Sequence, residues 1–362
     1  MLFNVLVVFV ILNVLISLFK RKSIILLYAS IIFIVIVFVG SRGVADLHNY
    51  TYDFAHGYER FWKGGQFLFH FITESCHKIG MSFDLYRCLL SILGLSLYLY
   101  LIKSYSPLPN MVIAAYMSYL MIMDDVQIRN FLGCAVFGLA IYSLFEQKNN
   151  WRKKYVFWIV IASTIHSSFW VYLIFLFIPK NINDDGLIKK IGIGALIFSV
   201  VVLFTREYLN NIVMFFSFID EEKTEHYLLE TTRFGGALFA IIQVFVIMCI
   251  LYLKRNIFSK CSTAALVNDK TYLILQISLL INILSLVLVP AAIFSITFYR
   301  LLRNLFFVNA IVFTIGYYRM KFRLLAFLML FIYTGLFYYY DLTGEIYILE
   351  ILVPFFNNNI YL

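Results

Sequence analysis

Apolar runs about as long as a membrane is thick follow one another through nearly the whole chain. Because a helix needs roughly 20 mostly apolar residues to cross a hydrocarbon core about 30 Å thick, each run predicts a membrane span. A water-soluble globule is excluded, since only 14% of the 362 residues are charged, against roughly 25% in an average soluble domain. We predict an all-α polytopic membrane protein with about ten full spans, at residues 2–19, 23–39, 83–102, 110–124, 127–145, 190–205, 235–253, 272–296, 304–318 and 324–340.

Two further segments do not fit the pattern of a simple span. Residues 151–179 are apolar but carry His166 near the middle, and a single span there would reverse the side of every later loop. We interpret this segment as a re-entrant pair of short helices that turn at His166, because irregular backbone at membrane depth is tolerated where it is buried in protein or lines a wet cavity. Residues 66–82 mix Phe with charged side chains and predict an amphipathic helix at the membrane interface.

Basic residues gather on one side of the predicted spans. With the re-entrant pair in place, most of the 29 Lys and Arg residues fall in short loops on a single side, which the positive-inside rule identifies as cytoplasmic. The N-terminus and the long loops at 40–66 and 206–234 then lie outside. The first apolar run lacks a basic leading segment and a small-residue cleavage site, so we predict a mature span and a single integral membrane domain over 1–362.

The sequence lacks common motifs of nucleotide and metal chemistry. It contains no GxxxxGK[ST] phosphate loop, GxGxxG fingerprint, CxxC pair or HExxH helix, so neither an ATP-driven pump nor a zinc protease is supported and no cofactor is predicted. His70, Glu74 and His77 share one helical face, but Glu74 can pair with Lys78 four residues on, and a metal site is the weaker interpretation. The basic loops also lack the groove with interleaved aromatic residues that nucleic-acid binding needs.

Arg129 stands at the predicted outer end of an apolar helix, directly after Gln127 and Ile128. Asp125 lies four residues before it on the same helical face, so a salt bridge between the two is one interpretation. The other is that the guanidinium binds an anionic ligand, because Arg grips phosphate bidentately and stays charged. Both roles can hold together.

His166 is surrounded by small hydroxyl residues, in the stretch STIHSS at 163–168. Such neighbours can fix the ring and pair its nitrogens at membrane depth. One interpretation is therefore a structural histidine. The other is a general base, or a hydrogen-bond partner that orients a sugar hydroxyl, since imidazole titrates near neutral pH.

Further cations are predicted on the same outer side. Arg42 and Asp46 stand where the chain leaves the second span, with Tyr50 in the same loop, and they are either solvated loop residues or part of a site. Several arginines from separate spans can together hold a diphosphate that a metal would otherwise neutralise. The candidates for that role are Arg129, Arg233, Arg300 and Arg303.

The sequence resembles the EpsG-like family of bacterial exopolysaccharide and O-antigen polymerases of the Wzy type. The similarity covers nearly the whole chain in layout, and its most specific part is a pair of short motifs about 37 residues apart, around Arg129 and His166. Such families usually have a small residue a few positions after the helix arginine, as Gly133 and Ala135 are here. Four places carry the resemblance: the cluster of Arg42, Asp46 and Tyr50, the stretch Gln127-Ile128-Arg129, the stretch Ile165-His166-Ser167-Ser168, and Tyr299-Arg300.

The resemblance implies a GT-C-like glycosyltransferase architecture and polymerisation of repeat units carried on undecaprenyl diphosphate, at the outer face of the bacterial cytoplasmic (inner) membrane. An acceptor sugar hydroxyl would attack the donor's anomeric carbon and expel the lipid diphosphate, so the site must remove a proton and stabilise leaving-group charge. Besides the lipid-linked oligosaccharide and the bilayer, a chain-length regulator and a flippase are expected partners. On this interpretation His166 and Asp46 are catalytic, and the substrate-binding residues are Arg42, Tyr50, Gln127, Arg129, Arg233, Arg300 and Arg303.

Other functions must account for the same charges. A polyprenol-dependent glycosyltransferase that adds one sugar would share the outer site but form a single product instead of a ladder. A flippase or exporter of lipid-linked glycan would need a charged cavity through the membrane centre, whereas the mid-span positions here are mostly Leu, Ile, Val and Phe. An O-acyltransferase would need a deep histidine that is reached from the cytoplasm.

Overall fold

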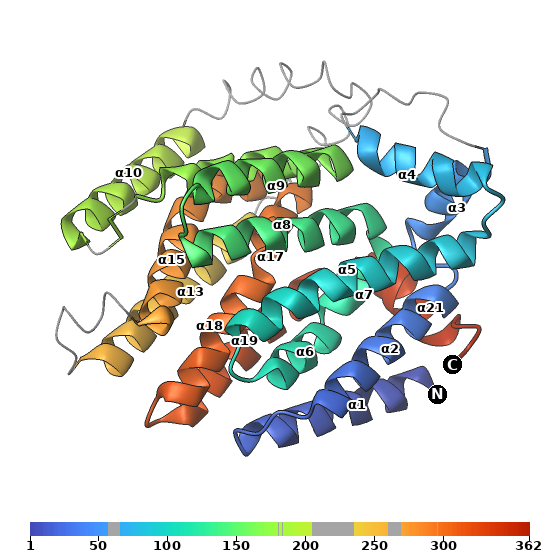
Figure 1. The fold of residues 1–362 in the computed structure, drawn as a ribbon, viewed down its shortest axis with the longest axis horizontal. Coiled ribbons are helices and arrows are strands. Elements are labelled where there is room, and N and C mark those ends of the chain that lie inside the picture. The colour runs from blue at the N-terminus through green and yellow to red at the C-terminus, as the bar shows by residue number, and fades with distance from the viewer. Residues whose placement is uncertain (57–65, 180, 183, 205–234, 260–268, 295) are drawn as a thin grey trace. The chain divides into compact units, whose positions relative to one another are not determined.

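The computed structural model is built from helices and describes residues 1–56, 66–179, 181–182, 184–204, 235–259, 269–294 and 296–362 (Figure 1). Within these residues, β-type pairing is confined to one antiparallel bridge between Ser41 and Asn359. Six helices of the described chain are long and apolar enough to cross a membrane. The prediction of an all-helical polytopic membrane protein is confirmed, although these six are fewer than the ten full spans expected.

The helices form two compact units, and each is described by itself. Unit 1 comprises Met1–Trp170 together with Phe322–Leu362. Its helices are α1 (Leu2–Leu18), α2 (Ile24–Gly40), α3 (Leu47–His56), α4 (Phe67–Lys78), α5 (Phe83–Tyr105), α6 (Pro109–Ser118), α7 (Leu120–Val126), α8 (Ile128–Glu146), α9 (Trp151–Ile165), α19 (Arg323–Leu342), α20 (Glu345–Tyr347), η5 (Ile348–Leu352) and α21 (Val353–Asn357).

Unit 2 comprises Val171–Lys321. The 3₁₀ helix η2 (Ser167–Phe177) follows α9 and runs across the boundary between the units. The other helices of unit 2 are α10 (Asp185–Phe204), α13 (Gly235–Phe258), α15 (Lys270–Leu284), η3 (Ser285–Leu288), α16 (Val289–Phe294), η4 (Ile296–Tyr299), α17 (Arg300–Arg303) and α18 (Phe306–Arg319).

Several predicted boundaries are corrected by the structure. Residues 110–124 form α6 and α7 instead of one span, because Tyr119 between them adopts non-helical angles of φ −150° and ψ −71°. The residues predicted as a span at 304–318 form α18, whose 14 residues extend about 21 Å, less than a hydrocarbon core of about 30 Å. The predicted loop at 40–66 contains the helix α3, and the predicted loop at 206–234 lies outside the described residues.

The predicted break at His166 is confirmed. Helix α9 ends at Ile165, His166 has extended backbone angles of φ −145° and ψ 116°, and η2 follows directly. The 15 residues of α9 extend about 22 Å, which agrees with the expected pair of short helices. The amphipathic helix predicted at 66–82 is present as α4.

Buried asparagine side chains connect α1, α2 and α6. Asn110 Nδ2 donates to Asn13 Oδ1 (2.7 Å), and Asn13 Nδ2 donates to Ser30 Oγ (2.8 Å). The backbone N–H of Ser23 donates to Asn110 Oδ1 (3.0 Å). In lipid there is no hydrophobic driving force between helices, so polar contacts and close packing hold them together.

A similar chain of amides joins three helices of unit 2. Gln243 Nε2 on α13 donates to the backbone carbonyl oxygen (2.7 Å) and to Oδ1 (3.1 Å) of Asn282 on α15. Asn282 Nδ2 in turn donates to Asn309 Oδ1 on α18 (2.8 Å). All three residues are buried, and the network fixes the register of α13, α15 and α18 within the unit.

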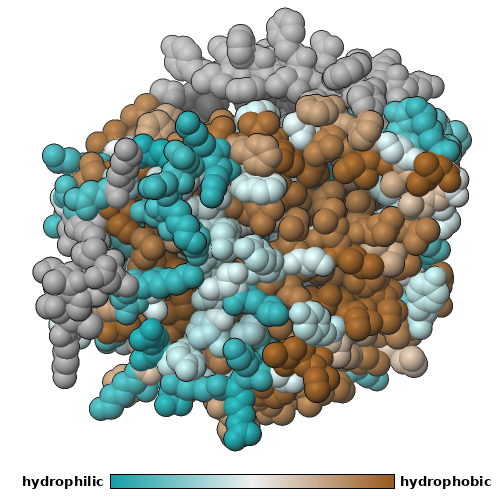
Figure 2. Space-filling view, in the orientation of Figure 1, coloured by the Kyte–Doolittle hydropathy of each residue, from teal (hydrophilic) through white to brown (hydrophobic). Residues whose placement is uncertain are grey.

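Apolar side chains also cover the outside of many helices. On α5, about half of the surface of Leu85, Leu89, Ile92 and Leu93 is exposed. Figure 2 shows a broad hydrophobic area in the right half of the face it displays. Extended apolar surface on helices of spanning length indicates a multi-pass protein whose outside contacts lipid.

The last residues of unit 1 are fastened to the end of α2. The N–H of Ile360 donates to the carbonyl oxygen of Gly40 (2.9 Å), and Asn359 Nδ2 donates to the carbonyl oxygen of Val37 (3.0 Å). A side chain at Gly40 would overlap the amide of Asn359. Since α2 ends at Gly40, this clamp helps to fix the corner from which Arg42 projects.

Candidate functional site

Arg129 lies in the first turn of α8, where α3 and α4 meet this helix. Its Nη1 donates to Gln66 Oε1 (2.9 Å), and its Nε points at the hydroxyl of Tyr50 (3.4 Å). The guanidinium carbon also lies 5.4 Å from the centroid of the Tyr50 ring and 6.0 Å from that of Phe69. Aromatic faces and an amide oxygen therefore hold the half-buried cation in place.

The predicted pairing of Asp125 with Arg129 is not what the structure shows. Gln127 has non-helical angles of φ −110° and ψ 63°, so α7 ends before it and α8 begins after it. The spacing of four residues therefore no longer places Asp125 and Arg129 on one helical face. Asp125 forms its ion pair with Arg87 of α5 instead (2.7 Å).

The pair of Arg87 and Asp125 is deeply buried. The two side chains are only 2% and 0% exposed, and Arg87 Nη1 also donates to the carbonyl oxygen of Ser41 (3.0 Å). Charges at such depth persist only when they are paired and hydrogen-bonded. The sequence signal for this pair is the single arginine inside the apolar run at 83–102, since an ionisable residue within a span is costly unless it is paired.

Arg42 is held at the corner between α2 and α3. Its Nη1 donates to the carbonyl oxygens of Val39 (2.7 Å) and Ser41 (2.8 Å), and its Nη2 pairs with Asp84 Oδ1 (2.7 Å). About a third of the Arg42 side chain is exposed. Arg42 and Arg87 thus share the carbonyl oxygen of Ser41, which places two cations beside the end of α2.

Asp46 and Tyr50 lie one helical turn apart at the start of α3. The N–H of Tyr50 donates to the backbone carbonyl oxygen of Asp46 (3.2 Å). Tyr50 contacts Arg129. The half-buried Asp46, one turn before Tyr50, therefore lies close to the region where α3 meets α8. Of the outer-loop cluster predicted from the sequence, Tyr50 reaches Arg129 directly, and Arg42 is engaged by Asp84.

His166 is oriented by the hydroxyl residue that follows it. The N–H of Ser168 points at His166 Nδ1 (3.3 Å), and Ser168 Oγ lies 2.8 Å from the same nitrogen. A nitrogen that accepts from a backbone N–H carries no proton, so the neutral ring has its proton on Nε2. This geometry favours His166 as a hydrogen-bond donor to a substrate oxygen over His166 as a base.

Gly133 brings His166 close to α8. A Cβ on Gly133 would lie 2.5 Å from Cε2 of Phe169 and 3.4 Å from Cβ of His166. Gly133 follows Arg129 by four residues and so lies about one turn along the same face of α8. Helices α8 and α9 lie side by side, and α4 packs on α9 (Figure 1). The motifs around Arg129 and His166 therefore meet at one end of the α8–α9 pair.

The remaining predicted arginines belong to unit 2 or lie outside the described residues. Arg303 is fully buried, where its Nη1 donates to the hydroxyl of Tyr299 (2.9 Å). Tyr299 stacks on Phe239 at 4.9 Å between ring centroids. Arg300 opens α17 and is half-buried, while Arg233 is not among the described residues.

The expected ion pair is present on helix α4. Lys78 Nζ lies 2.6 Å from Glu74 Oε1, as the spacing of four residues predicts. His77 is exposed and its ring contacts the edge of Phe54 (5.5 Å). Among the described residues, no group of three or more His, Cys, Asp or Glu side chains is arranged to hold a metal ion.

Comparison with known proteins gives one result for this chain. The model of the EpsG family matches residues 24–350, which include every predicted site residue. No curated protein and no solved structure gives a significant match.

Proposed function

The chain belongs to the EpsG family, and we propose that it joins lipid-diphosphate-linked oligosaccharide repeat units into a polysaccharide at the outer face of the bacterial cytoplasmic membrane. One observation carries this proposal. Arg129, a half-buried cation flanked by the aromatic ring of Tyr50, and His166, whose Nδ1 accepts from the N–H of Ser168, lie at the same end of the α8–α9 pair.

The proposed glycosyl transfer needs a cation and a hydrogen-bond donor, which Arg129 and His166 provide. The oxygen of an acceptor sugar hydroxyl forms a bond to the donor's anomeric carbon, and the bond from that carbon to the diphosphate oxygen breaks. The leaving diphosphate keeps the electron pair, and the hydroxyl proton passes to a base. Cations and hydrogen-bond donors placed where the leaving-group charge develops lower the barrier. The cleaved linkage supplies the free energy, so the reaction needs no nucleotide.

We assign the diphosphate to Arg129, with Gln66 and Tyr50 holding the guanidinium in place. His166 donates from Nε2 to a substrate oxygen, and Asp46 is the base that takes the hydroxyl proton. Arg42 and Gln127 position the substrate beside these groups. In unit 2, Arg300 and Arg303, together with Arg233, are further proposed ligands of the substrate.

Reconstitution tests this proposal. Purified protein in nanodiscs is incubated, without nucleotide, with undecaprenyl-diphosphate-linked repeat units, and the products are separated on a gel. We expect a ladder that disappears in Arg129→Ala and His166→Ala and persists in the matched control Arg255→Ala, which alters an exposed arginine of α13. A single product band would indicate a one-step glycosyltransferase. Movement of the lipid across a vesicle membrane without any product would indicate a flippase and contradict the catalytic assignments.

A further inference from the structure

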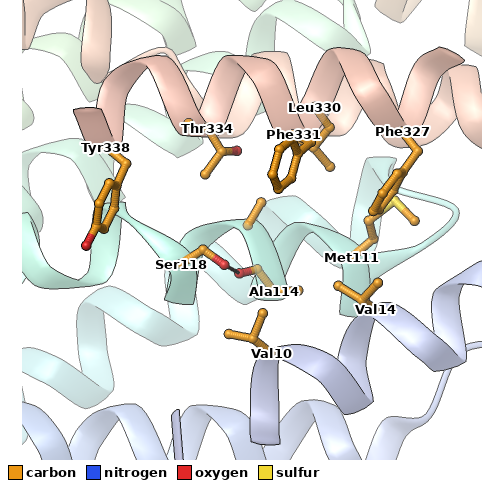
Figure 3. Close-up of a pocket in the computed structure, with 12 residues that line it drawn as sticks. Val10, Val14, Met111, Ala114, Ser118, Phe327, Leu330, Phe331, Thr334 and Tyr338 are labelled. Carbon is orange, nitrogen blue, oxygen red and sulfur yellow. Dashed lines mark hydrogen bonds between the residues drawn. The ribbon is translucent and has the colours of Figure 1, made fainter. Parts of the chain in front are cut away.

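A groove runs between α1, α6 and α19 of unit 1. In Figure 3, Val14 of α1, Met111 of α6 and Phe327 of α19 lie together at one end of it. The hydroxyl residues of the lining, Ser118 and Thr334, lie further along, and Thr334 is two turns of α19 beyond Phe327. The end of the groove at Phe327 is therefore lined by apolar side chains.

Arg323 stands beyond this apolar end, on the same face of α19. It opens the helix and precedes Phe327 by four residues, which places it one turn, about 6 Å, further along that face. The same face continues in the other direction through Phe331 and Thr334, and both of these residues line the groove. The stripe of α19 that faces the groove thus ends in a cation.

Lys20 brings a second cation to this end of the groove. Helix α1 ends at Leu18, and Lys20 follows Val14 of the groove wall by six residues. The backbone turns at Lys20 with a φ of 54°, and its N–H donates to the carbonyl oxygen of Ser17 (2.9 Å). Burial lowers the pKa of the Lys20 ammonium, and the charge of Arg323 lowers it further. The fold therefore holds two like charges near each other, a repulsion that a bound anion would relieve.

The two cations are flanked by exposed aromatic rings. Phe19 and Phe322, the neighbours of Lys20 and Arg323 in the chain, are 75% and 69% exposed. Neither α2 nor α19 carries an acidic residue in its first turn. Cations beside exposed apolar rings are typical of the boundary between hydrocarbon and headgroups, where the available anions are lipid phosphates.

This pair of cations lies across the membrane from the proposed chemistry. Helix α2 begins at Ile24, directly after the turn that contains Lys20, and ends at Gly40, beside Arg42. Its 17 residues extend about 25 Å, most of a hydrocarbon core of about 30 Å. A lipid phosphate at Lys20 and Arg323 therefore belongs to the leaflet opposite the Arg42 corner.

We propose that Lys20 and Arg323 bind the phosphate of an anionic phospholipid, one acyl chain of which lies in the apolar end of the groove between α1, α6 and α19. Guanidinium and ammonium groups hold a phosphate through charge-assisted hydrogen bonds. The ligand carries a hydrocarbon chain because the apolar wall begins one turn from Arg323. It is a phospholipid because these cations face the leaflet away from the proposed donor site. This inference goes beyond the proposed function and does not depend on it.

Native mass spectrometry of the full chain in a neutral detergent tests the inference. The probes are a phosphatidylglycerol and a phosphatidylcholine with the same acyl chains. We expect one phosphatidylglycerol to bind roughly tenfold more tightly than phosphatidylcholine, because the choline cancels the phosphate charge. Arg323→Gln and Lys20→Gln should each weaken the binding of phosphatidylglycerol about fivefold. Arg323→Lys keeps the charge and should retain most of the binding.

The matched control is Arg255→Gln. It removes the same charge from an exposed arginine near the end of α13, outside the groove, and should bind phosphatidylglycerol like the unaltered protein. Equal losses in Arg255→Gln and Arg323→Gln would show a diffuse attraction to basic loops and would overturn the inference. So would equal binding of the two lipids by the unaltered protein.

Competition identifies the ligand. Millimolar inorganic phosphate should leave phosphatidylglycerol bound, and its release would mean that the cations take a soluble anion without the groove. Displacement by a lower concentration of polyprenyl monophosphate would assign the site to a different lipid and overturn the choice of a phospholipid. A phosphatidylglycerol with a diazirine in one acyl chain should label peptides from 109–118 and 323–342, and labelling confined to other peptides would refute the place of the chain. None of these measurements uses polymer formation, so their results stand apart from those for the proposed function.

Discussion

The missing side chain of Gly133 leaves just enough room for the ring of Phe169. A Cβ at position 133 would lie 2.5 Å from Phe169 Cε2, and the Phe169 ring is fully buried. Phe169 in turn stands edge-on to His166, at 6.1 Å between ring centroids and an angle of 88°. The glycine one turn after Arg129 thus determines how closely the turn at His166 approaches α8.

Substitution at Gly133 should therefore displace His166. Gly133→Ala forces Phe169 and the following turn away from α8, and overpacking of this kind costs about 1–3 kcal/mol. We expect a large loss of polymer formation in the nanodisc assay, with protein still recovered in the membrane. The control is Gly138→Ala on the same helix, where the nearest atom, Leu101 Cδ2, lies at an ordinary 3.5 Å. Equal activity of the two variants would contradict this account.

The buried pair of Arg87 and Asp125 should matter mainly for stability. Removing one partner leaves a buried charge alone, so Arg87→Ala should lower the free energy of unfolding by about 3–5 kcal/mol. Asp84→Asn breaks the more exposed pair with Arg42, and its cost should be at most about 1 kcal/mol. Unfolding of both variants in mixed micelles with increasing SDS gives the comparison. Similar decreases in the free energy of unfolding for the two variants would mean that water reaches the pair of Arg87 and Asp125.

Two substitutions at His166 should distinguish a hydrogen-bond donor from a base. If Nε2–H donates to substrate, the amide of His166→Gln can partly replace it, and some polymer should form. His166→Ala offers no donor and should form none. A base cannot be replaced by an amide, so equal inactivity of both variants, with intact folding, would contradict the donor role. Asp46→Asn serves as the matched test of the base and should be inactive.

The clamp at the end of α2 should affect activity without touching substrate. Asn359→Ala removes the bond to the carbonyl oxygen of Val37 and one acceptor used by the N–H groups of Tyr361 and Leu362. We expect a severalfold fall in the rate of polymer formation, since a hydrogen bond of this kind is worth about 1 kcal/mol. Asn357→Ala, at an exposed position two residues earlier, should have no effect. An unchanged rate in Asn359→Ala would show that the corner is held without the clamp.

The sequence predicted the features that arise from local composition. Long apolar runs predicted the helices, and the side on which the later basic loops fall predicted the break at His166. The break at Tyr119 carries no proline or glycine and was missed, whereas a boundary near Gln127 was predicted by the spans at 110–124 and 127–145. The non-helical angles of Gln127 also change the partner of Asp125 from the expected Arg129 to Arg87.

The partners of Arg129 also could not be predicted. Gln66 and Tyr50 lie 63 and 79 residues away in the chain, and pairing over such distances follows from how helices pack and not from spacing. The sequence singled out Arg129, His166 and Tyr50, and the structure places all three in unit 1.

The bridge between Ser41 and Asn359 also has a consequence for the order of events at the ribosome. Val37 and Asn359 are 322 residues apart, and at roughly 5–20 residues per second the second follows the first by about 15–65 s. During that interval the corner that carries Arg42 has no clamp. A nascent chain therefore completes this corner only after residues 359–360 have been made.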